Sequence, residues 1–195
     1  MNLRRSKSGE TGGGRLFVIS GPSGSGKTTL VARMKDLPGF FYSVSVTSRP
    51  SRPNEREGKD YYFVTRGHFE KMVSQDTFAE HACVAGNLYG TPKQPLHEAL
   101  AAGRNALVDI DVQGAMQIKE KFPRAVLVFI EPPSMDVLES RLRGRGTESQ
   151  EAIERRLALA KREMEYAGQY DYRIVNDDLE RAVRELRDIL LSEGN

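Results

Sequence analysis

The segment from Leu16 to Leu30 constrains the fold more than any other part of the chain. It begins with the apolar run L-F-V-I, which is short and partly β-branched, as expected of a buried strand. The residues that follow match the phosphate-binding pattern G-x-x-x-x-G-K-[ST]: Gly21, Pro22, Ser23, Gly24, Ser25, Gly26, Lys27 and Thr28. A helix is expected to begin near Lys27 and to turn its apolar residues inward.

The chemistry of phosphate binding explains these residue types. A loop that curls around a phosphate must point successive N–H groups at one centre, and glycine reaches the necessary backbone angles without steric cost. The following helix adds the positive end of its dipole. Lys27 would reach the β- and γ-phosphates of a nucleotide, and the Thr28 hydroxyl would hold Mg²⁺. The alternative is a Gly/Ser-rich linker, but the strand before and the helix after favour a P-loop.

Charge and composition narrow the class of protein. The 195 residues suit one soluble domain. The formal net charge of the chain is +2, and residues 1–15 alone carry +3. The remaining residues therefore carry −1, which gives no electrostatic case for binding nucleic acid. Residues 1–14 are polar and Gly/Ser-rich, and we expect them to be disordered. The alternative is a basic tail that touches RNA or an acidic partner.

The sequence lacks the features of a secreted or membrane protein, and this predicts a cytoplasmic location. The single cysteine, Cys83, cannot form an internal disulfide, and no His and Cys residues have zinc-ligand spacing. No signal-peptide core precedes the first strand, and the longest apolar run, Ala125 to Ile130, is too short to span a membrane. The sequence therefore predicts a cytoplasmic protein without a membrane or nucleic-acid partner. It leaves the oligomeric state open.

Strand and helix patterns alternate along the chain. Further strands are predicted at Phe41–Val46, Tyr61–Val64, Phe78–Val84, Asn105–Asp111, Ala125–Ile130 and Tyr172–Val175, with a turn at Gly86–Pro92. Helices are predicted at Gly67–Ser74 and Pro95–Ala102, and after caps at Ser134, Ser149 and 176–178. This order favours an α/β fold of the P-loop NTPase type, a doubly wound parallel sheet with helices on both faces and an irregular insertion between 41 and 92.

Two groups of arginines stand apart from the P-loop. Arg49 and Arg52 each precede a proline, which holds them extended and spaced to clamp one anion, although a solvated charged loop explains them equally well. The segment 141–156 holds five arginines around two glycines, which suggests a mobile flap over phosphates rather than a solvated face. Two such groups indicate two phosphate-bearing ligands, and therefore phosphoryl transfer between nucleotides more than hydrolysis.

Asp109 and Asp111 lie at the end of a predicted apolar strand. Ligands of α/β sheets bind at the carboxyl ends of strands, and in P-loop proteins such an acid commonly lies near the metal. A structural helix cap is the alternative. We expect Asp109, with Thr28, to serve the metal directly or through water.

Longer segments resemble the guanylate kinase family, in its bacterial single-domain form. The resemblance rests on S-R-P-S-R-P-N-E-R-E-G-K-D-Y-Y-F-V, on F-A-E-H-A-C-V-A-G-N-L-Y-G-T-P, on L-V-D-I-D-V-Q-G, on R-G-R-G-T-E and on D-Y-R-I-V-N-D-D-L, in family order over residues 15–195. It implies Mg²⁺-dependent transfer from ATP to GMP, giving ADP and GDP. It also implies a core (15–42, 96–137 and 158–195), an inserted mixed α/β GMP-binding region (about 43–95) and a helical lid (about 138–157).

The same resemblance implies roles for individual residues. It assigns the GMP phosphate to Ser45, Arg49, Arg52, Tyr61 and Tyr89, the guanine edge to Glu80, Thr91 and Asp111, the ATP phosphates to Arg145 and Arg156, and a position near adenine to Asn176. Catalysis would rest on Lys27, Arg49, Arg145 and Arg156.

The chemistry of guanine agrees with the place given to Glu80. A carboxylate that accepts the N1–H and N2–H₂ donors of guanine distinguishes it from adenine, so Glu80 is the expected base reader.

Two other functions compete with this prediction. The first is a protein-binding module of the same fold, which would lose the P-loop lysine or the lid arginines. Lys27, Thr28, Arg145 and Arg156 are all present, and this favours the enzyme. The second is a kinase for another nucleoside monophosphate, which would leave the acceptor role of Glu80 unused. The resemblance also suggests that dGMP is accepted, because no residue identified here contacts the 2′-position.

Overall fold

A five-stranded parallel sheet forms the centre of the fold. The computed structural model describes residues 13–144 and 149–194, so residues 1–12 of the expected tail and the predicted lid residue Arg145 lie outside it. The tail was predicted to be disordered as far as residue 14, but Gly14 donates its N–H to the Leu100 carbonyl at 2.8 Å. The strands are β1 (Leu16–Ser20), β2 (Phe40–Tyr42), β7 (Asn105–Asp109), β8 (Val126–Glu131) and β9 (Tyr172–Val175), in the order β2-β7-β1-β8-β9. The P-loop follows the central strand β1, between the ends of β7 and β8.

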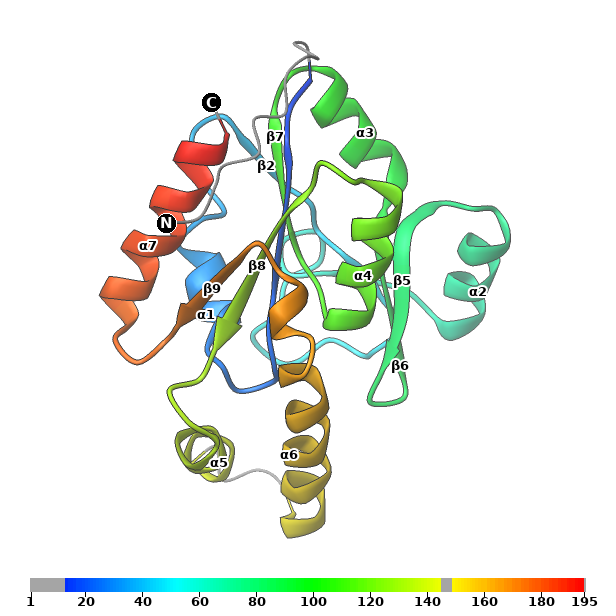
Figure 1. Cartoon of the computed structure of the whole chain (residues 1–195). Coiled ribbons are helices and arrows are strands. Elements are labelled where there is room, and N and C mark those ends of the chain that lie inside the picture. Colours follow the sequence, from blue (N-terminus) through cyan, green and yellow to red (C-terminus); the bar gives the residue numbers. More distant parts are fainter. Residues whose placement is uncertain (1–12, 145–148, 195) are drawn as a thin grey trace.

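Helices cover both faces of this sheet, which confirms the predicted doubly wound α/β fold (Figure 1). α1 (Lys27–Ala32) and α7 (Leu179–Glu193) cover one face, and α3 (Lys93–Ala101) and α4 (Val112–Lys121) cover the other. β1 supplies both cores, because successive side chains point to opposite faces: Phe17 packs on the first side and Val18 on the second. Burial on both sides explains why the strand is apolar throughout.

A second, four-stranded sheet lies beside the first. It contains β3 (Val46–Thr47), β4 (Tyr62–Phe63), β5 (Phe78–Val84) and β6 (Asn87–Pro92), in the order β4-β3-β6-β5. Helix α2 (Arg66–Ser74) packs on it, and the Phe69 and Phe78 rings stack with centroids 4.6 Å apart. This sheet occupies the stretch that the sequence marked as an insertion.

Two local predictions in this region are wrong. The strand expected at Phe41–Val46 is divided, because the chain leaves the parallel sheet after β2 and joins the second sheet at β3. Gly86–Pro92 is not a turn: the turn is formed by Ala85 and Gly86, with φ of 49° and 82°, and β6 then pairs antiparallel with β5. Gly90 breaks the alternation of side chains expected of a strand. A glycine lies there because the Phe78 ring packs directly over it and leaves no room for a side chain.

Two further helices project below the sheet (Figure 1). α5 (Met135–Arg143) and α6 (Gln150–Met164) pack on each other through a small apolar cluster. The predicted caps are confirmed, since the Ser134 hydroxyl accepts from Val137 N at 3.2 Å and the Ser149 hydroxyl from Ala152 N at 3.3 Å. A short 3₁₀ turn, η1 (Ala167–Gln169), leads from α6 into β9.

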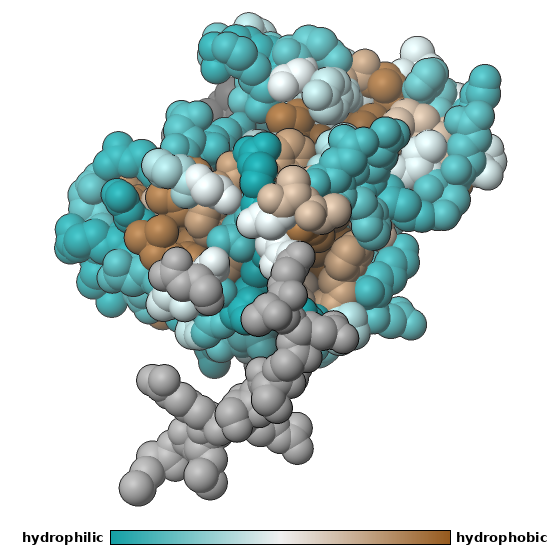
Figure 2. All heavy atoms as spheres, turned by 90° about the horizontal axis from the view of Figure 1, so that it is seen from above, coloured by the Kyte–Doolittle hydropathy of each residue, from teal (hydrophilic) through white to brown (hydrophobic). Residues whose placement is uncertain are grey.

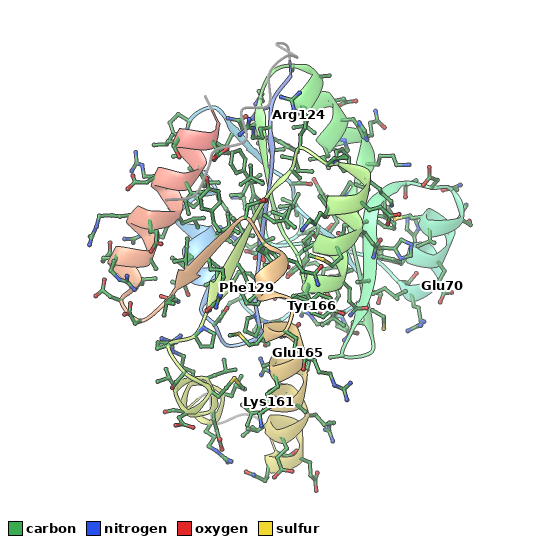
Figure 3. All side chains as sticks on the ribbon, viewed as in Figure 1. Glu70, Arg124, Phe129, Lys161, Glu165 and Tyr166 are labelled. Atoms are coloured by element: carbon green, nitrogen blue, oxygen red, sulfur yellow. The ribbon has the colours of Figure 1, made fainter. Side chains whose placement is uncertain are left out.

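Side chains follow the expected division between core and surface. Phe129 of β8 lies fully buried, whereas Lys161 of α6, Glu165 directly after α6 and Glu70 of α2 are exposed (Figure 3). Figure 2 views the end of the molecule where β1 begins, opposite the P-loop, and shows separate hydrophobic patches among hydrophilic side chains. Among the residues that the structure describes, no helix has the length and apolar character needed to cross a membrane.

Candidate active site

The P-loop has the strained backbone that its glycines predict. Gly21, Gly24 and Gly26 have φ of 150°, 96° and 88°, which side-chain-bearing residues rarely adopt. Gly26 is the N-cap of α1, so the first N–H groups of that helix face the loop interior. The sequence therefore builds an anion-binding cradle at the carboxyl end of β1.

The side chains of Asn176 and Arg141 both bind the backbone of the P-loop. The Asn176 side-chain amide is buried and donates to the Ser25 carbonyl at 2.8 Å, and its nitrogen lies directly against Gly26. Arg141 donates to the same Ser25 carbonyl at 3.3 Å and to the Asn176 carbonyl at 2.9 Å. This position makes Asn176 a support of the P-loop backbone, a contact that the sequence did not indicate.

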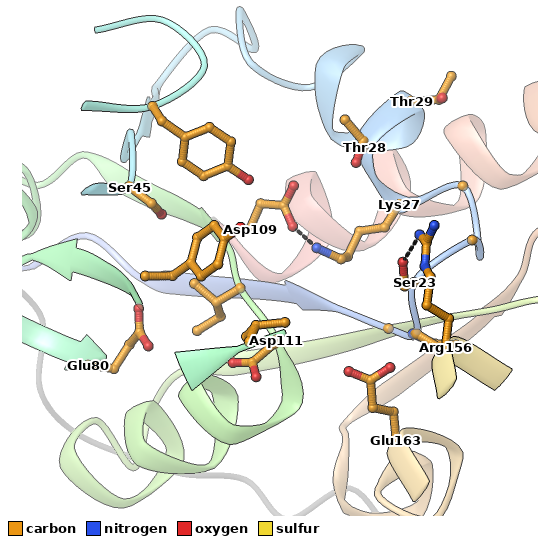
Figure 4. Close-up of a pocket in the computed structure, with 18 of the residues that line it drawn as sticks. Ser23, Lys27, Thr28, Thr29, Ser45, Glu80, Asp109, Asp111, Arg156 and Glu163 are labelled. Atoms are coloured by element: carbon orange, nitrogen blue, oxygen red, sulfur yellow. Dashed lines mark hydrogen bonds and ion pairs between the residues drawn. The ribbon is translucent and has the colours of Figure 1, made fainter. Parts of the chain in front are cut away.

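Lys27 forms an ion pair with Asp109 at the end of β7 (Figure 4). Both side chains are largely buried, so neither charge is strongly screened by solvent. Thr28 is exposed at the start of α1 and lines the same cavity. From α6, Arg156 donates to the hydroxyl of Ser23 in the P-loop, as the dashed line in Figure 4 marks.

Arg49 is the centre of a polar cluster on the second sheet. Its guanidinium donates to both oxygens of Glu55, at 2.7 and 2.9 Å, and to the Tyr89 hydroxyl at 3.2 Å. The Tyr61 ring meets the Tyr89 ring edge-on, with centroids 5.9 Å apart. Arg52 is mostly exposed and donates its backbone N–H to Glu55 at 2.8 Å. Arg49 and Arg52 thus lie together, as an anion clamp requires.

Glu80 projects from β5 into the interior and is only 2% exposed. One carboxylate oxygen accepts the Thr91 hydroxyl at 2.6 Å. Burial, and next the charge of Asp111, raise the pKa of Glu80 to about 7, against the opposing effect of the Thr91 hydrogen bond. Asp111 itself caps α4 by accepting Gly114 N–H at 3.0 Å, and burial raises its pKa.

One cavity of about 290 Å³ joins these parts. The predicted site residues that line it are Gly21, Pro22, Ser23, Gly24, Gly26, Lys27, Thr28, Ser45, Arg52, Tyr61, Glu80, Tyr89, Asp109, Asp111 and Arg156. The predicted residues outside this lining are Ser25, Arg49, Thr91 and Asn176, which contact it through a lining residue or support the loop. Arg145 lies beyond the described ranges.

Glu163 is a cavity residue that sequence reasoning missed. It lies on α6, is 6% exposed, and has one carboxylate oxygen without a hydrogen-bond partner among the described residues. Burial, and next the charge of Asp111, raise the pKa of Glu163 to about 7. The sequence did contain a signal for it. Glu163 follows Ala160 by three residues and precedes Ala167 by four, so it is a charged residue on the helix face that is expected to be apolar.

A P-loop at the end of the central strand places the chain among the P-loop nucleotide-binding proteins, and the buried Glu80 on the same cavity gives it the second binding end that a nucleotide kinase needs. Comparison with known proteins agrees. The family model described as guanylate kinase matches residues 13–193. The chain is 50% identical to a guanylate kinase of Gloeobacter violaceus over 92% of this chain and 88% of that one, and 51% identical to one of Syntrophotalea carbinolica over 93% and 87%.

Solved structures show the same relationship. A guanylate kinase from Anaplasma phagocytophilum superposes with a TM-score of 0.78 at 37% identity, covering 94% of this chain and 88% of that one. A shikimate kinase from Bacteroides thetaiotaomicron, at a TM-score of 0.52 and 19% identity over 91% and 98% of the two chains, shares the fold alone. The chain belongs to the guanylate kinase family.

Proposed function

We propose that this chain transfers the γ-phosphoryl group of ATP to GMP, and to dGMP, giving ADP and GDP (or dGDP) with the help of Mg²⁺. The observation that carries the proposal is that one cavity is lined by both the P-loop and the Glu80 carboxylate, at opposite ends of one space (Figure 4). A phosphate-binding end and a base-reading end are what a nucleotide-to-nucleotide transfer requires. We place the reaction in the cytoplasm, as the single unpaired cysteine suggests.

We divide the chain into three functional parts along the same lines. The core holds the P-loop, the region of about 43–95 holds GMP, and the lid of about 138–157 closes over ATP. The second sheet supports the assignment of the GMP-binding region, because all of its strands lie between residues 46 and 92. The projecting helices α5 and α6 support the assignment of the lid, since Arg156 of α6 contacts Ser23 of the P-loop.

At the ATP end, we assign the phosphates to the P-loop backbone from Gly21 to Thr28, with Lys27 as the main positive charge. Lys27 pairs with Asp109 in this structure, so the nucleotide phosphates would compete with Asp109 for it. Arg156, together with Arg145, would add charge as the lid closes. The contacts of Asn176 support a role in holding the loop that surrounds these phosphates.

Mg²⁺ fits the donors at this end. The Thr28 hydroxyl and the Asp109 carboxylate both line the cavity, and oxygen ligands are those that Mg²⁺ prefers. Within residues 13–144 and 149–194, no group of three or more His, Cys, Asp or Glu side chains could hold a metal alone. This suits an ion held mainly by nucleotide phosphates, with Thr28 and Asp109 (directly or through water) as its protein partners. When bound, it neutralises phosphate charge.

At the GMP end, we assign the phosphate to the clamp of Arg49 and Arg52, with Ser45, Tyr61 and Tyr89 beside it. The Glu55 carboxylate now occupies the Arg49 guanidinium, so the phosphate would take over those donors. We assign the guanine edge to Glu80 and the Thr91 hydroxyl bound to it, together with Asp111, which lines the same cavity and whose charge acts on Glu80.

The chemistry needs no nucleophile from the protein. An oxygen of the GMP phosphate forms the new bond to the γ-phosphorus of ATP, and the bond from that phosphorus to the ADP oxygen breaks. The chain aligns the two phosphates and neutralises their charge with Lys27 and the arginines, and closure of the lid excludes water.

The first test is a coupled ADP-release assay with MgATP and GMP, dGMP, AMP, CMP, UMP or dTMP in turn. We expect release with GMP and dGMP only. Release with none of them, although GMP binds, would favour a protein-binding module. Release with AMP or a pyrimidine nucleotide would contradict the assignment of Glu80.

GMP binding is expected to tighten as the pH rises from about 6 to 8. Burial raises the pKa of Glu80 to about 7, and only the ionised carboxylate accepts two guanine donors, so free energy spent on deprotonation weakens binding at low pH. Below this pKa the change should approach roughly tenfold per pH unit. Calorimetry of GMP binding measures it, and the control is Glu80→Gln, which keeps the titrations of the GMP phosphate and of Glu163. Equal pH profiles for the two proteins would contradict the prediction.

A further inference from the structure

The Glu80 carboxylate is in contact with the protein on two sides. One contact is a hydrogen bond, and the other is close packing against a backbone. On one side, Thr91 stands opposite Glu80 in the β5–β6 ladder and donates to it at 2.6 Å. The ladder changes register between Phe78 and Glu80, and such irregularities re-aim side chains. On the other side lies the first turn of α4, where Gly114 presents its bare Cα.

Gly114 leaves no room for a side chain. A Cβ built on it would lie 2.3 Å from the second Glu80 oxygen, 3.0 Å from the Glu80 Cδ and 3.3 Å from an Asp111 oxygen. The first of these distances is far below any real contact, so the carboxylate would have to move. Glu80 is 2% exposed, bonded to Thr91 and part of the cavity wall, so a displaced carboxylate strains that bond or enters the space proposed for the base.

The backbone gives no other reason for a glycine here. Gly114 is not among the residues with positive φ, and it lies within the regular helix α4. At such a position alanine stabilises a helix by about 1 kcal/mol relative to glycine. The absent side chain therefore lowers helix stability, and what it provides in return is space for the Glu80 carboxylate.

We propose that Gly114 is a positioning residue for base recognition: its missing side chain fixes where the Glu80 carboxylate stands against the guanine edge. This inference rests on the proposed role of Glu80. A carboxylate displaced by about 1 Å loses the alignment that paired hydrogen bonds need. Substitution at Gly114 therefore weakens the binding of GMP and leaves the ATP end unchanged.

The test is Gly114→Ala, with KM for GMP and for ATP measured separately and thermal unfolding followed in parallel. We expect KM for GMP to rise about tenfold or more, since a misplaced group costs up to about 10²-fold. KM for ATP should stay within about twofold. The matched control is Gly67→Ala: Gly67 lies in the first turn of α2, and a Cβ there would meet nothing within 4 Å. It should leave both KM values unchanged. An unchanged KM for GMP in Gly114→Ala overturns the proposal.

A double-mutant cycle with Glu80→Ala shows whether the effect passes through Glu80. In the Glu80→Ala background the carboxylate is gone, so adding Gly114→Ala should leave the calorimetric Kd for GMP unchanged. A further loss in that background would overturn the proposal. If Gly114→Ala alone fails to fold, the double variant should fold again, and its failure to do so would count against the contact. An unchanged preference for GMP in Glu80→Ala alone would instead show that the base-reading role itself is wrong.

Discussion

Lys27→Ala is expected to lower kcat for ADP release by on the order of 10³-fold, the upper end for removal of one transition-state donor. Lys27 is the cation at the start of α1, inside the P-loop and at the cavity wall. It stabilises charge on the transferring phosphoryl group, and no neighbouring group on α1 replaces it. GMP should still bind with nearly unchanged affinity, because its proposed contacts lie on the second sheet, on the loops joined to it and at the start of α4, and do not include Lys27.

The measurement is the coupled assay together with calorimetric binding of GMP in the absence of ATP. Lys161→Ala is the matched control, because Lys161 is an exposed lysine on α6 (Figure 3). It should keep full activity. Turnover in Lys27→Ala within about tenfold of the wild type would exclude the proposed role of the P-loop lysine.

Local signals were enough to predict the parts of the fold that nucleate the site. The P-loop motif carries its own turn residues, and the glycines at 21, 24 and 26 adopt the positive φ angles that the motif demands. The helix caps at Ser134 and Ser149 were equally predictable, because a cap contacts a backbone group only three residues away.

Long-range pairing was not predictable from local patterns. An alternating strand looks the same whether it stays in one sheet or passes into another, so the division of Phe41–Val46 left no trace in periodicity. The β6 strand was mistaken for a turn because Gly90 resembles a breaker. The glycine is there to receive the Phe78 ring, a partner twelve residues away.

The site shows the same limit. The sequence and its family resemblance named most of the cavity wall, but they did not show that Lys27 pairs with Asp109 or that Asn176 holds Ser25. These contacts join residues that are distant along the chain. Glu163 was missed for another reason: an acid on a helix face that is otherwise apolar is unexpected unless that face borders a polar cavity.

Glu80→Gln is expected to lower kcat/KM for GMP by roughly 10²-fold and to change that for AMP little. Glutamine presents one oxygen and one NH₂ group, so a donor would face a guanine donor where the carboxylate had offered an acceptor. Hydrogen bonds to a charged group contribute about 1.5–3 kcal/mol each, and loss of about 3 kcal/mol corresponds to roughly 10²-fold. The Thr91 hydroxyl can still donate to the remaining oxygen, so the fold around β5 should persist.

The coupled assay with GMP and with AMP measures this change as a ratio. Glu70→Gln is the matched control, since Glu70 is an exposed acid of α2 that pairs with Arg66 on the same helix. The ratio should fall only for Glu80→Gln, because Glu80 borders the cavity and Glu70 does not. A fall in activity with both nucleotides alike would mean that Glu80 supports the cavity wall without reading the base. An unchanged ratio at full activity would place the base reader elsewhere, with Asp111, a cavity carboxylate whose charge acts on Glu80, as the next candidate.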